Sequence, residues 1–280
     1  MRFTKMQGCG NDYIYVNCFE ESVKEPEKLA VKISDRHFGV GSDGLVLITK
    51  SDVADCRMRM YNSDGSEAEM CGNASRCVAK YVYDKGIVKK DTIALETGAG
   101  IKYIDVTVNE KGEAVLFKVN MGKPILEGKD IPVESEKSPV IGLKLKSVDR
   151  DFDFTCVSMG NPHAVTFISD DIASFELEKY GAPLETDKHF PKKSNIEFAK
   201  VTGKNTIDMR VWERGAGETL ACGTGACATA VAACLEGLCE RKNIKIKLLG
   251  GELDILWSEE DGNVYMTGPA EFVFEGTWEI

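Results

Sequence analysis

The chain has 280 residues, of which 45 are acidic and 35 are basic, so its formal net charge at pH 7 is −10. Nucleic acids and anionic membranes attract basic surfaces, and we therefore expect neither as a partner. The N-terminal residues lead into no apolar signal core, and no apolar run reaches the roughly 18 residues of a membrane span. These features predict a cytoplasmic, globular protein.

Strand patterns dominate the first half of the chain. Short β-prone runs predict strands over residues 2–6, 13–16, 45–48, 56–61, 93–96, 101–108 and 114–119. Two helices are expected, one from Pro26 to Phe38 that ends at Gly39, and one over residues 73–85 that ends at Gly86. The segment 112–124 is either the crossover to the second half or, with the polar turn 109–112, part of a hairpin.

The second half repeats this scheme. Strands are predicted near residues 154–157, 164–168, 196–201 and 207–213, helices over 172–180 and 224–238, and a hairpin-rich tail over 244–280. The helix that begins at Thr224 is apolar or small on every side, which is typical of a buried helix. Strands before and after it in sequence indicate a curled sheet around a central helix, once in each half.

Several segments of the first half recur in the second half, in the same order and at nearly one spacing. Residues 58–73 match 209–224 at an offset of 151 residues, and the other pairs are 10–11 with 160–161 and 35–38 with 187–190. We interpret this as a duplicated domain. The predicted fold is α+β with two pseudo-symmetric domains, the first comprising residues 1–118 with a returning strand at 268–280 and the second residues 119–267.

Two of the ten cysteines differ from the rest in their context. The absence of an export signal and of Cys-x-x-Cys spacing argues against disulfides and zinc, so most of the ten are expected to be buried small hydrophobes. Cys71 and Cys222 occupy matching repeat positions, each at the start of a predicted helix. A helix N-terminus lowers a thiol pKa, by an interaction of about 0.3–1 kcal/mol, and so favours the reactive thiolate.

Two thiols on opposite sides of one carbon could invert that carbon without a cofactor. If the halves pack face to face, Cys71 and Cys222 would meet across a pseudo-twofold axis. Repulsion between two thiolates in such a site, about 2–3 kcal/mol, would leave the pair with one shared proton, as one base and one acid. The residues after each cysteine, Gly72-Asn73 and Gly223-Thr224, leave N–H groups free to hold a substrate carboxylate.

Taken together, these motifs resemble those of the diaminopimelate epimerases, nearly from end to end of the chain. The matching blocks are residues 62–73 with Arg76, 213–225, 10–12, 39–44, 159–163 and 194–198. The resemblance implies a cofactor-independent exchange between LL- and meso-2,6-diaminopimelate in lysine and peptidoglycan precursor biosynthesis, performed by a homodimer. Two positions depart from the family pattern: Gly44 stands where some members carry a substrate-contacting Gln, and Ala74 replaces a commoner Gly.

The resemblance also implies roles for individual residues. Cys71 and Cys222 would be the proton acceptor and donor, and His163 and Glu213 would tune their pKa values. The residues expected to bind substrate are Asn11, Asn62, Gly72, Asn73, Asn161, Asn195, Glu213, Arg214, Gly223 and Thr224. Arg214 would pair with the distal carboxylate of the substrate and Glu213 with its distal ammonium.

Two other readings of the chain stay open at this point. A related cysteine-pair racemase would act on proline, hydroxyproline or another amino acid, but a proline-type substrate has no distal group for Glu213 and Arg214 to hold. A non-catalytic metal or thiol-redox protein would bind zinc in stoichiometric amount. We expect no metal and no cofactor.

Overall fold

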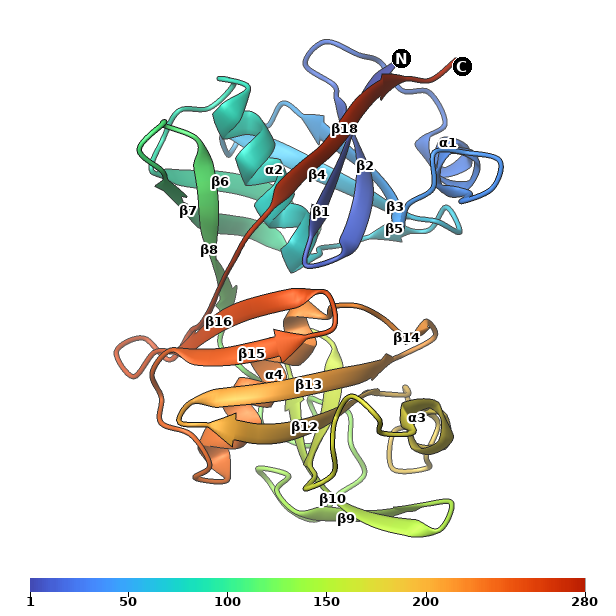
Figure 1. Cartoon of the computed structure of the whole chain (residues 1–280), viewed down its shortest axis with the longest axis vertical. Helices are drawn as coiled ribbons and strands as arrows, with labels where there is room; N and C mark the ends of the chain where they lie inside the picture. Colours follow the sequence, from blue (N-terminus) through green and yellow to red (C-terminus); the bar gives the residue numbers. More distant parts are fainter. Residues whose placement is uncertain (280) are drawn as a thin grey trace. The chain divides into compact units, whose positions relative to one another are not determined.

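The computed structural model describes residues 1–279, whose contacts divide the chain into two compact units. The first unit contains residues 1–120 and the C-terminal segment from 267 onward, and the second contains residues 121–266. The chain leaves the first unit within strand β8 (Ala114–Gly122) and returns within β17 (Val264–Gly268). Strand β18 (Glu271–Thr277) then pairs antiparallel with the N-terminal strand, so both ends of the chain lie in the first unit (Figure 1).

The first unit is a mostly antiparallel sheet that curls around helix α2 (Figure 1). Its remaining strands are β1 (Arg2–Gly8), β2 (Asn11–Asn17), β3 (Gly44–Thr49), β4 (Cys56–Asn62), β5 (Glu67–Ala68), β6 (Thr92–Thr97) and β7 (Gly100–Val108), and its helices are α1 (Pro26–Ser34) and α2 (Gly72–Asp84). Helix α2 is buried along most of its length, including all of Gly72 to Ala79.

The second unit has the same plan around helix α4 (Figure 1). Its strands are β9 (Leu143–Ser147), β10 (Arg150–Ser158), β11 (Pro162–Phe167), β12 (Asn195–Gly203), β13 (Thr206–Glu213), β14 (Gly217–Glu218), β15 (Ile244–Leu248) and β16 (Gly251–Trp257), and its helices are α3 (Leu177–Glu185) and α4 (Gly223–Leu235). Helix α4 is buried on every side from Gly225 to Ala233, as its lack of a polar face predicts.

The strand pairing of the two units is the same. In each unit an antiparallel pair (β1–β2, β10–β11) is followed by a parallel pair (β2–β3, β11–β12) and another antiparallel pair (β3–β4, β12–β13). An ion pair repeats as well, because Arg59 Nε lies 3.0 Å from Glu67 Oε1 and Arg210 Nε lies 2.6 Å from Glu218 Oε1. The predicted α+β fold with two pseudo-symmetric domains is confirmed.

Three predicted helices have wrong boundaries. Helix α4 ends at Leu235 and not at 238, and for the other two helices a side chain explains the difference. The helix from Pro26 ends at Ser34 because the Asp35 carboxylate accepts the backbone N–H groups of His37 and Phe38, both at 2.7 Å, which closes a turn in place of another helical turn. The other helix, predicted over 172–180, spans Leu177–Glu185 instead.

The guanidinium of Arg210 accounts for the late start of α3. Its Nη1 donates to the carbonyls of Ile172 and Phe175, at 2.9 and 2.8 Å. These carbonyls face Arg210 from a turn that precedes the helix, so helical bonding begins only at Leu177. The turn at 109–112 proves to be a hairpin, since Gly112 N–H donates to the Asn109 carbonyl, and the unit boundary follows later in β8. Strands β5, β9 and β14 were not predicted.

Strand β12 separates two environments in the second unit. Ile196 and Phe198 belong to an aromatic core that includes residues of α3, and the Phe198 ring lies 4.7 Å from that of Phe175 between centroids. The alternate residues, Asn195 and Glu197, point to the opposite face, where α4 lies. The period of the strand therefore places two polar side chains beneath the first turn of α4.

A close approach between β3 and β4 gives a first prediction. A Cβ atom added at Gly44 would lie 2.1 Å from the Tyr61 carbonyl oxygen, and because this oxygen belongs to the paired β4 backbone it cannot move aside cheaply. We expect Gly44→Ala to lower the free energy of unfolding by about 1–3 kcal/mol or more in urea denaturation. Gly203→Ala is the matched control, since its nearest neighbour would be at 3.6 Å, and it should change stability by less than about 0.5 kcal/mol. Equal stability of the two variants would contradict this account.

Candidate active site

Cys71 lies at the N-cap of α2, in extended conformation with φ −139° and ψ 125°, directly before the first helical residue. Its Sγ donates to Asn11 Oδ1 at 3.5 Å. Asn11 follows the tight β1–β2 turn, in which Cys9 and Gly10 have positive φ. The turn therefore brings Asn11, predicted to bind substrate, against the thiol of the first unit.

A residue that was not predicted, Asp43, holds Asn11 in this position. Asp43 Oδ2 accepts the Asn11 amide at 2.7 Å and the backbone N–H of Asp12 at 3.2 Å, while Arg36 Nη2 lies 2.9 Å from Asp43 Oδ1. Burial raises the pKa of the Asp43 carboxyl, and the adjacent Asp12 carboxylate raises it further. The only sequence signal for Asp43 was its place in the block 39–44.

The first turn of α2 is enclosed by protein. Gly72 and Asn73 are buried, and Asn73 Oδ1 has no hydrogen-bond partner among residues 1–279. Arg76 is fully buried, and it donates to the carbonyls of Pro269 at 2.9 Å and Gly72 at 3.4 Å. This arginine ties the start of α2 to the returning C-terminal segment. Asn62 lies at the start of the β4–β5 turn, where its amide donates to Ser66 Oγ at 3.0 Å.

Cys222 occupies the equivalent N-cap of α4, with φ −117° and ψ 108°. Its side chain is 6% exposed; Sγ accepts the Gly225 N–H at 3.4 Å and lies 3.5 Å from Thr224 Oγ1. Gly223 is buried and Thr224 partly exposed in the first turn of α4.

The pKa of Cys222 differs from the expectation for a thiol at a helix N-terminus. Burial raises the pKa well above its ordinary value, and the carboxylates of Glu213 and then Glu197 raise it further. Hydrogen bonds from Thr224 and Gly225 act in the opposite direction but are outweighed. The prediction that the helix N-terminus would bring the pKa of this thiol near neutrality is therefore wrong for Cys222.

Glu213 ends strand β13, and Arg214 follows it in a turn. The Thr219 hydroxyl donates to Glu213 Oε1, and Arg214 Nη1 donates to the Lys192 carbonyl at 3.2 Å from an exposed position. Asn195, predicted to bind substrate, uses both ends of its amide within the protein: Nδ2 donates to the Pro162 carbonyl at 2.8 Å and Oδ1 accepts the Arg214 N–H at 2.9 Å. In this structure Asn195 thus braces the segment that carries Arg214.

His163 is fully buried between two oxygen atoms. Its Nδ1 lies 2.6 Å from Glu197 Oε1 and its Nε2 lies 3.0 Å from Asn161 Oδ1. Glu197 was not predicted, although it stands within the block 194–198. The second unit therefore brings together Asn161, His163 and Glu197, and Glu197 with Glu213 acts electrostatically on Cys222.

The two positions that depart from the family pattern are explained by close packing. Gly44 has no room for a Cβ, so a Gln side chain could not be accommodated there without displacing β4. Ala74 is fully buried in the first turn of α2.

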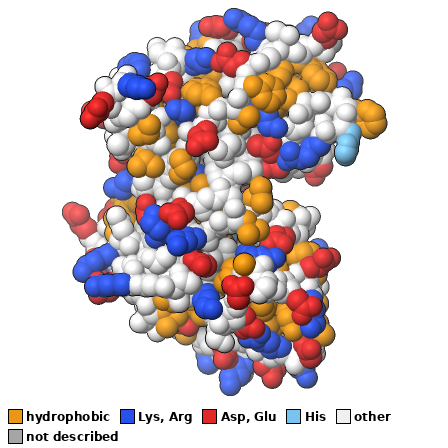
Figure 2. Space-filling model, viewed as in Figure 1, with side chains coloured by type: hydrophobic (Ala, Val, Ile, Leu, Met, Phe, Trp, Pro, Cys, Tyr) orange, Lys and Arg blue, Asp and Glu red, His pale blue; other side chains and the backbone are white. Residues whose placement is uncertain are grey.

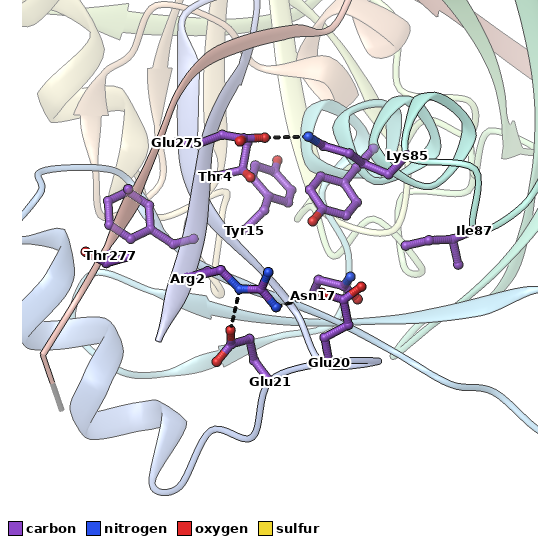
Figure 3. A pocket seen from close by; sticks show the side chains of 13 residues that line it. Arg2, Thr4, Tyr15, Asn17, Glu20, Glu21, Lys85, Ile87, Glu275 and Thr277 are labelled. Atoms are coloured by element: carbon purple, nitrogen blue, oxygen red, sulfur yellow. Dashed lines mark hydrogen bonds and ion pairs between the residues drawn. The ribbon is translucent and has the colours of Figure 1, made fainter.

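A separate cavity of about 510 Å³ lies in the first unit, and none of the predicted site residues lines it (Figure 3). Its charged groups already pair with one another: Arg2 with Glu20 and Glu21 at 2.8 and 3.0 Å, and Lys85 with Glu275 at 2.5 Å. On the face shown in Figure 2, basic and acidic side chains are likewise interspersed over each unit.

Within residues 1–279 none of the ten cysteines forms a disulfide, and no group of three or more His, Cys, Asp or Glu side chains could hold a metal ion. Nor does any helix of the described chain have the length and apolar character needed to cross a membrane.

The structural comparisons concern the fold. A phenazine biosynthesis protein of the PhzF family from Bacillus anthracis aligns with a TM-score of 0.74 over 100% of this chain and 99% of its own, at 18% identity. A probable proline racemase from Agrobacterium radiobacter aligns with a TM-score of 0.71 over 100% and 93%, at 13% identity. At such low identity these likenesses establish the architecture alone.

The sequence comparisons identify the family. A family model described as diaminopimelate epimerase matches residues 3–127 and 155–273. A protein named diaminopimelate epimerase from Methanococcus maripaludis is 58% identical over 280 residues, covering 100% of both chains, and one from Acetivibrio thermocellus is 59% identical, covering 100% of this chain and 99% of its own. The chain belongs to the diaminopimelate epimerase family.

Proposed function

We propose that this protein interconverts LL- and meso-2,6-diaminopimelate without a cofactor, in the biosynthesis of lysine and peptidoglycan precursors. Family membership over the whole chain supports the substrate. The observation that carries the mechanism is the paired placement of Cys71 and Cys222, each extended at the N-cap of a buried helix in one of two units with the same topology. In this proposal the two units are the halves of one epimerase.

The two thiols would act on opposite faces of the substrate α-carbon. One sulfur, as thiolate, removes the α-proton, and the other, as thiol, donates a proton to the opposite face, so that proton number and charge balance over the turnover. The burial of Cys222 beside two carboxylates supports it as the initial acid, which leaves Cys71 as the initial base. After one turnover the roles are exchanged, as a reversible epimerisation requires.

The helix N-termini would stabilise the carbanion. As the α-proton leaves, negative charge moves onto the substrate carboxylate, and N–H groups at Gly72-Asn73 and Gly223-Thr224 would donate to it. This requires donors that are already in place, and the burial of both first helical turns supports such preorganisation. Asn11, Asn62, Asn161 and Asn195 would position the rest of the amino-acid head.

The distal end of the substrate distinguishes diaminopimelate from proline. Its second ammonium would pair with Glu213 and its second carboxylate with Arg214. Two observations on Arg214 support this role. Its side chain is exposed, so the charge is accessible to substrate, and its backbone N–H is held by Asn195 Oδ1. Hydroxyproline-type substrates lack both distal groups.

Localisation and assembly complete the proposal. We place the enzyme in the cytoplasm, where it would form a homodimer. Strand β18 supports an apolar contact between copies, because Val273 and Phe274 are exposed on it. The domain limits 1–118 with 268–280, and 119–267, are those of the proposed halves.

Substitution of each thiol tests the two-base mechanism. We expect Cys71→Ser and Cys222→Ser each to lower the epimerisation rate by about 10²–10⁴-fold, because each removes one acid–base partner. Each variant should still eliminate halide from a halogenated analogue of one configuration, since elimination needs proton removal on one side only. Cys234→Ser, near the other end of α4, is the matched control and should retain full activity. Full activity of either active-site variant would refute the mechanism.

Isotope exchange tests the substrate. In deuterated water the protein should exchange the α-proton of diaminopimelate and leave proline unlabelled, because only diaminopimelate offers distal charges to Glu213 and Arg214. Mass spectrometry of each amino acid after incubation measures this. Exchange with proline alone would overturn the proposed substrate and favour the proline-type reading.

A further inference from the structure

A buried pair on the α4 face of the second unit has no counterpart in the first. In the parallel pairing of β11 with β12, His163 is opposite Asn195 and Val165 is opposite Glu197. Residues two apart on a strand share a face, so His163 and Glu197 are diagonal neighbours on one side of the sheet. Both side chains are 0% exposed, and the distance from Nδ1 to Oε1 is 2.6 Å.

The duplicated topology identifies the equivalent positions in the first unit. There β2 pairs with β3 in the same register, so that Tyr13 is opposite Gly44 and Tyr15 is opposite Val46. Tyr13 thus corresponds to His163, and Val46 to Glu197. The repeat places Asn62 where the second unit has Glu213. The second unit therefore places two carboxyl groups, those of Glu213 and Glu197, near its cysteine.

The side chain of His163 is held at both of its ring nitrogens. Asn161 Oδ1 accepts from Nε2 at 3.0 Å, and Nδ1 lies 2.6 Å from Glu197 Oε1. The imidazole is thereby fixed in orientation without leaving an isolated charge in the interior.

Glu197 also packs against the turn that binds the Cys222 sulfur. A Cβ atom on Gly225 would lie 2.8 Å from Glu197 Oε1 and 3.3 Å from Cys222 Sγ, so the carboxyl and the sulfur flank the same residue. The Gly225 N–H donates to Sγ. Glu197 Oε2 is buried without a hydrogen-bond partner among the described residues. A carboxyl group this close and this poorly solvated acts strongly on the thiol.

We propose that Glu197 is a positioning residue of the epimerisation: its buried carboxyl group fixes the orientation of His163 and flanks the turn that binds the Cys222 sulfur, so that the second unit supplies the acid at the start of turnover. This inference rests on the proposed function and adds to it a residue beyond His163 and Glu213. The groups that face Cys222 are Thr224 and the Gly225 N–H from α4, Glu213 from β13 and Glu197 from β12, with His163 of β11 acting through Glu197.

Glu197→Gln tests the proposal, because glutamine keeps the shape and can still hydrogen-bond His163 but carries no charge. Removal of an anion beside a thiol makes the thiolate less costly, so the pH midpoint for alkylation of Cys222 by iodoacetamide should fall by about one unit or more. Peptide mass spectrometry measures alkylation of Cys222 over pH. We expect kcat for diaminopimelate to fall at least tenfold and KM to change less than twofold, since a 0% exposed residue does not touch substrate.

Two variants serve as controls. Glu197→Asp keeps the charge and should leave the alkylation midpoint within 0.3 units of the wild type, a shift of about twofold in the thiolate fraction. Glu236→Gln removes the carboxyl group of an exposed residue that follows the far end of α4 and accepts from Thr155 at 2.7 Å, and it should change neither midpoint nor kcat. An unchanged midpoint in Glu197→Gln would overturn the proposal and leave Glu197 with a merely structural role.

A second test uses the wild-type protein and therefore does not require that the variant folds. Ring-¹⁵N NMR at pH 7 should show His163 with its proton on Nε2, the nitrogen that donates to Asn161 Oδ1, whereas an Nε2 without a proton would overturn the proposal. Both readouts are made without substrate. Failure to epimerise diaminopimelate would therefore refute the proposed function, and the result of the Glu197 test would still be valid.

Discussion

The structure depends on one constraint that is repeated in both units: a cysteine with extended backbone conformation stands directly before a helix that is buried on nearly all sides. Because α2 and α4 are enclosed by their own sheets, protein groups lie around the first turn of each helix. In the first unit Arg76 donates to the Gly72 carbonyl, and in the second the Gly225 N–H donates to the cysteine sulfur. The same enclosure that stabilises each helix therefore fixes the sulfur at its end.

The duplication preserves this frame while the charges around it have diverged. Cys71 lies beside a neutral amide, Asn11, whose own position is set by Asp43 one layer further out. Cys222 lies near two carboxyl groups and, through one of them, an imidazole. Strand register keeps the backbone equivalent, so a change at one position of β12, from valine in one copy to glutamate in the other, alters the proton affinity of the site without altering the fold.

The sequence predicted well the features that depend on the pattern of apolar and polar residues and on the spacing of the repeats. The lack of a polar face on α4 predicted its burial, and the 151-residue offset predicted both the duplication and the matched helix starts. The errors arose where groups distant in sequence determine a helix boundary or a pKa. No local pattern reveals that Arg210 binds the carbonyls of Ile172 and Phe175, or that burial would outweigh the helix N-terminus at Cys222. Glu197 was overlooked because an acidic residue in an alternating strand is usually solvent-exposed, and only the position of α4 shows otherwise.

A symmetric frame with asymmetric charge suits a reversible inversion of a stereocentre. Two identical thiol environments would give the shared proton no preferred site, and the resting enzyme would then be divided between two protonation forms of equal energy. Burial and nearby carboxyl groups at Cys222 remove this degeneracy, since each raises the free energy of the thiolate there. The bias must stay moderate, because each direction of the reaction begins from the form that the other direction leaves. The hydrogen bond between His163 Nδ1 and Glu197 Oε1 offsets part of this bias, and this is a physical reason for placing a histidine behind the carboxyl group.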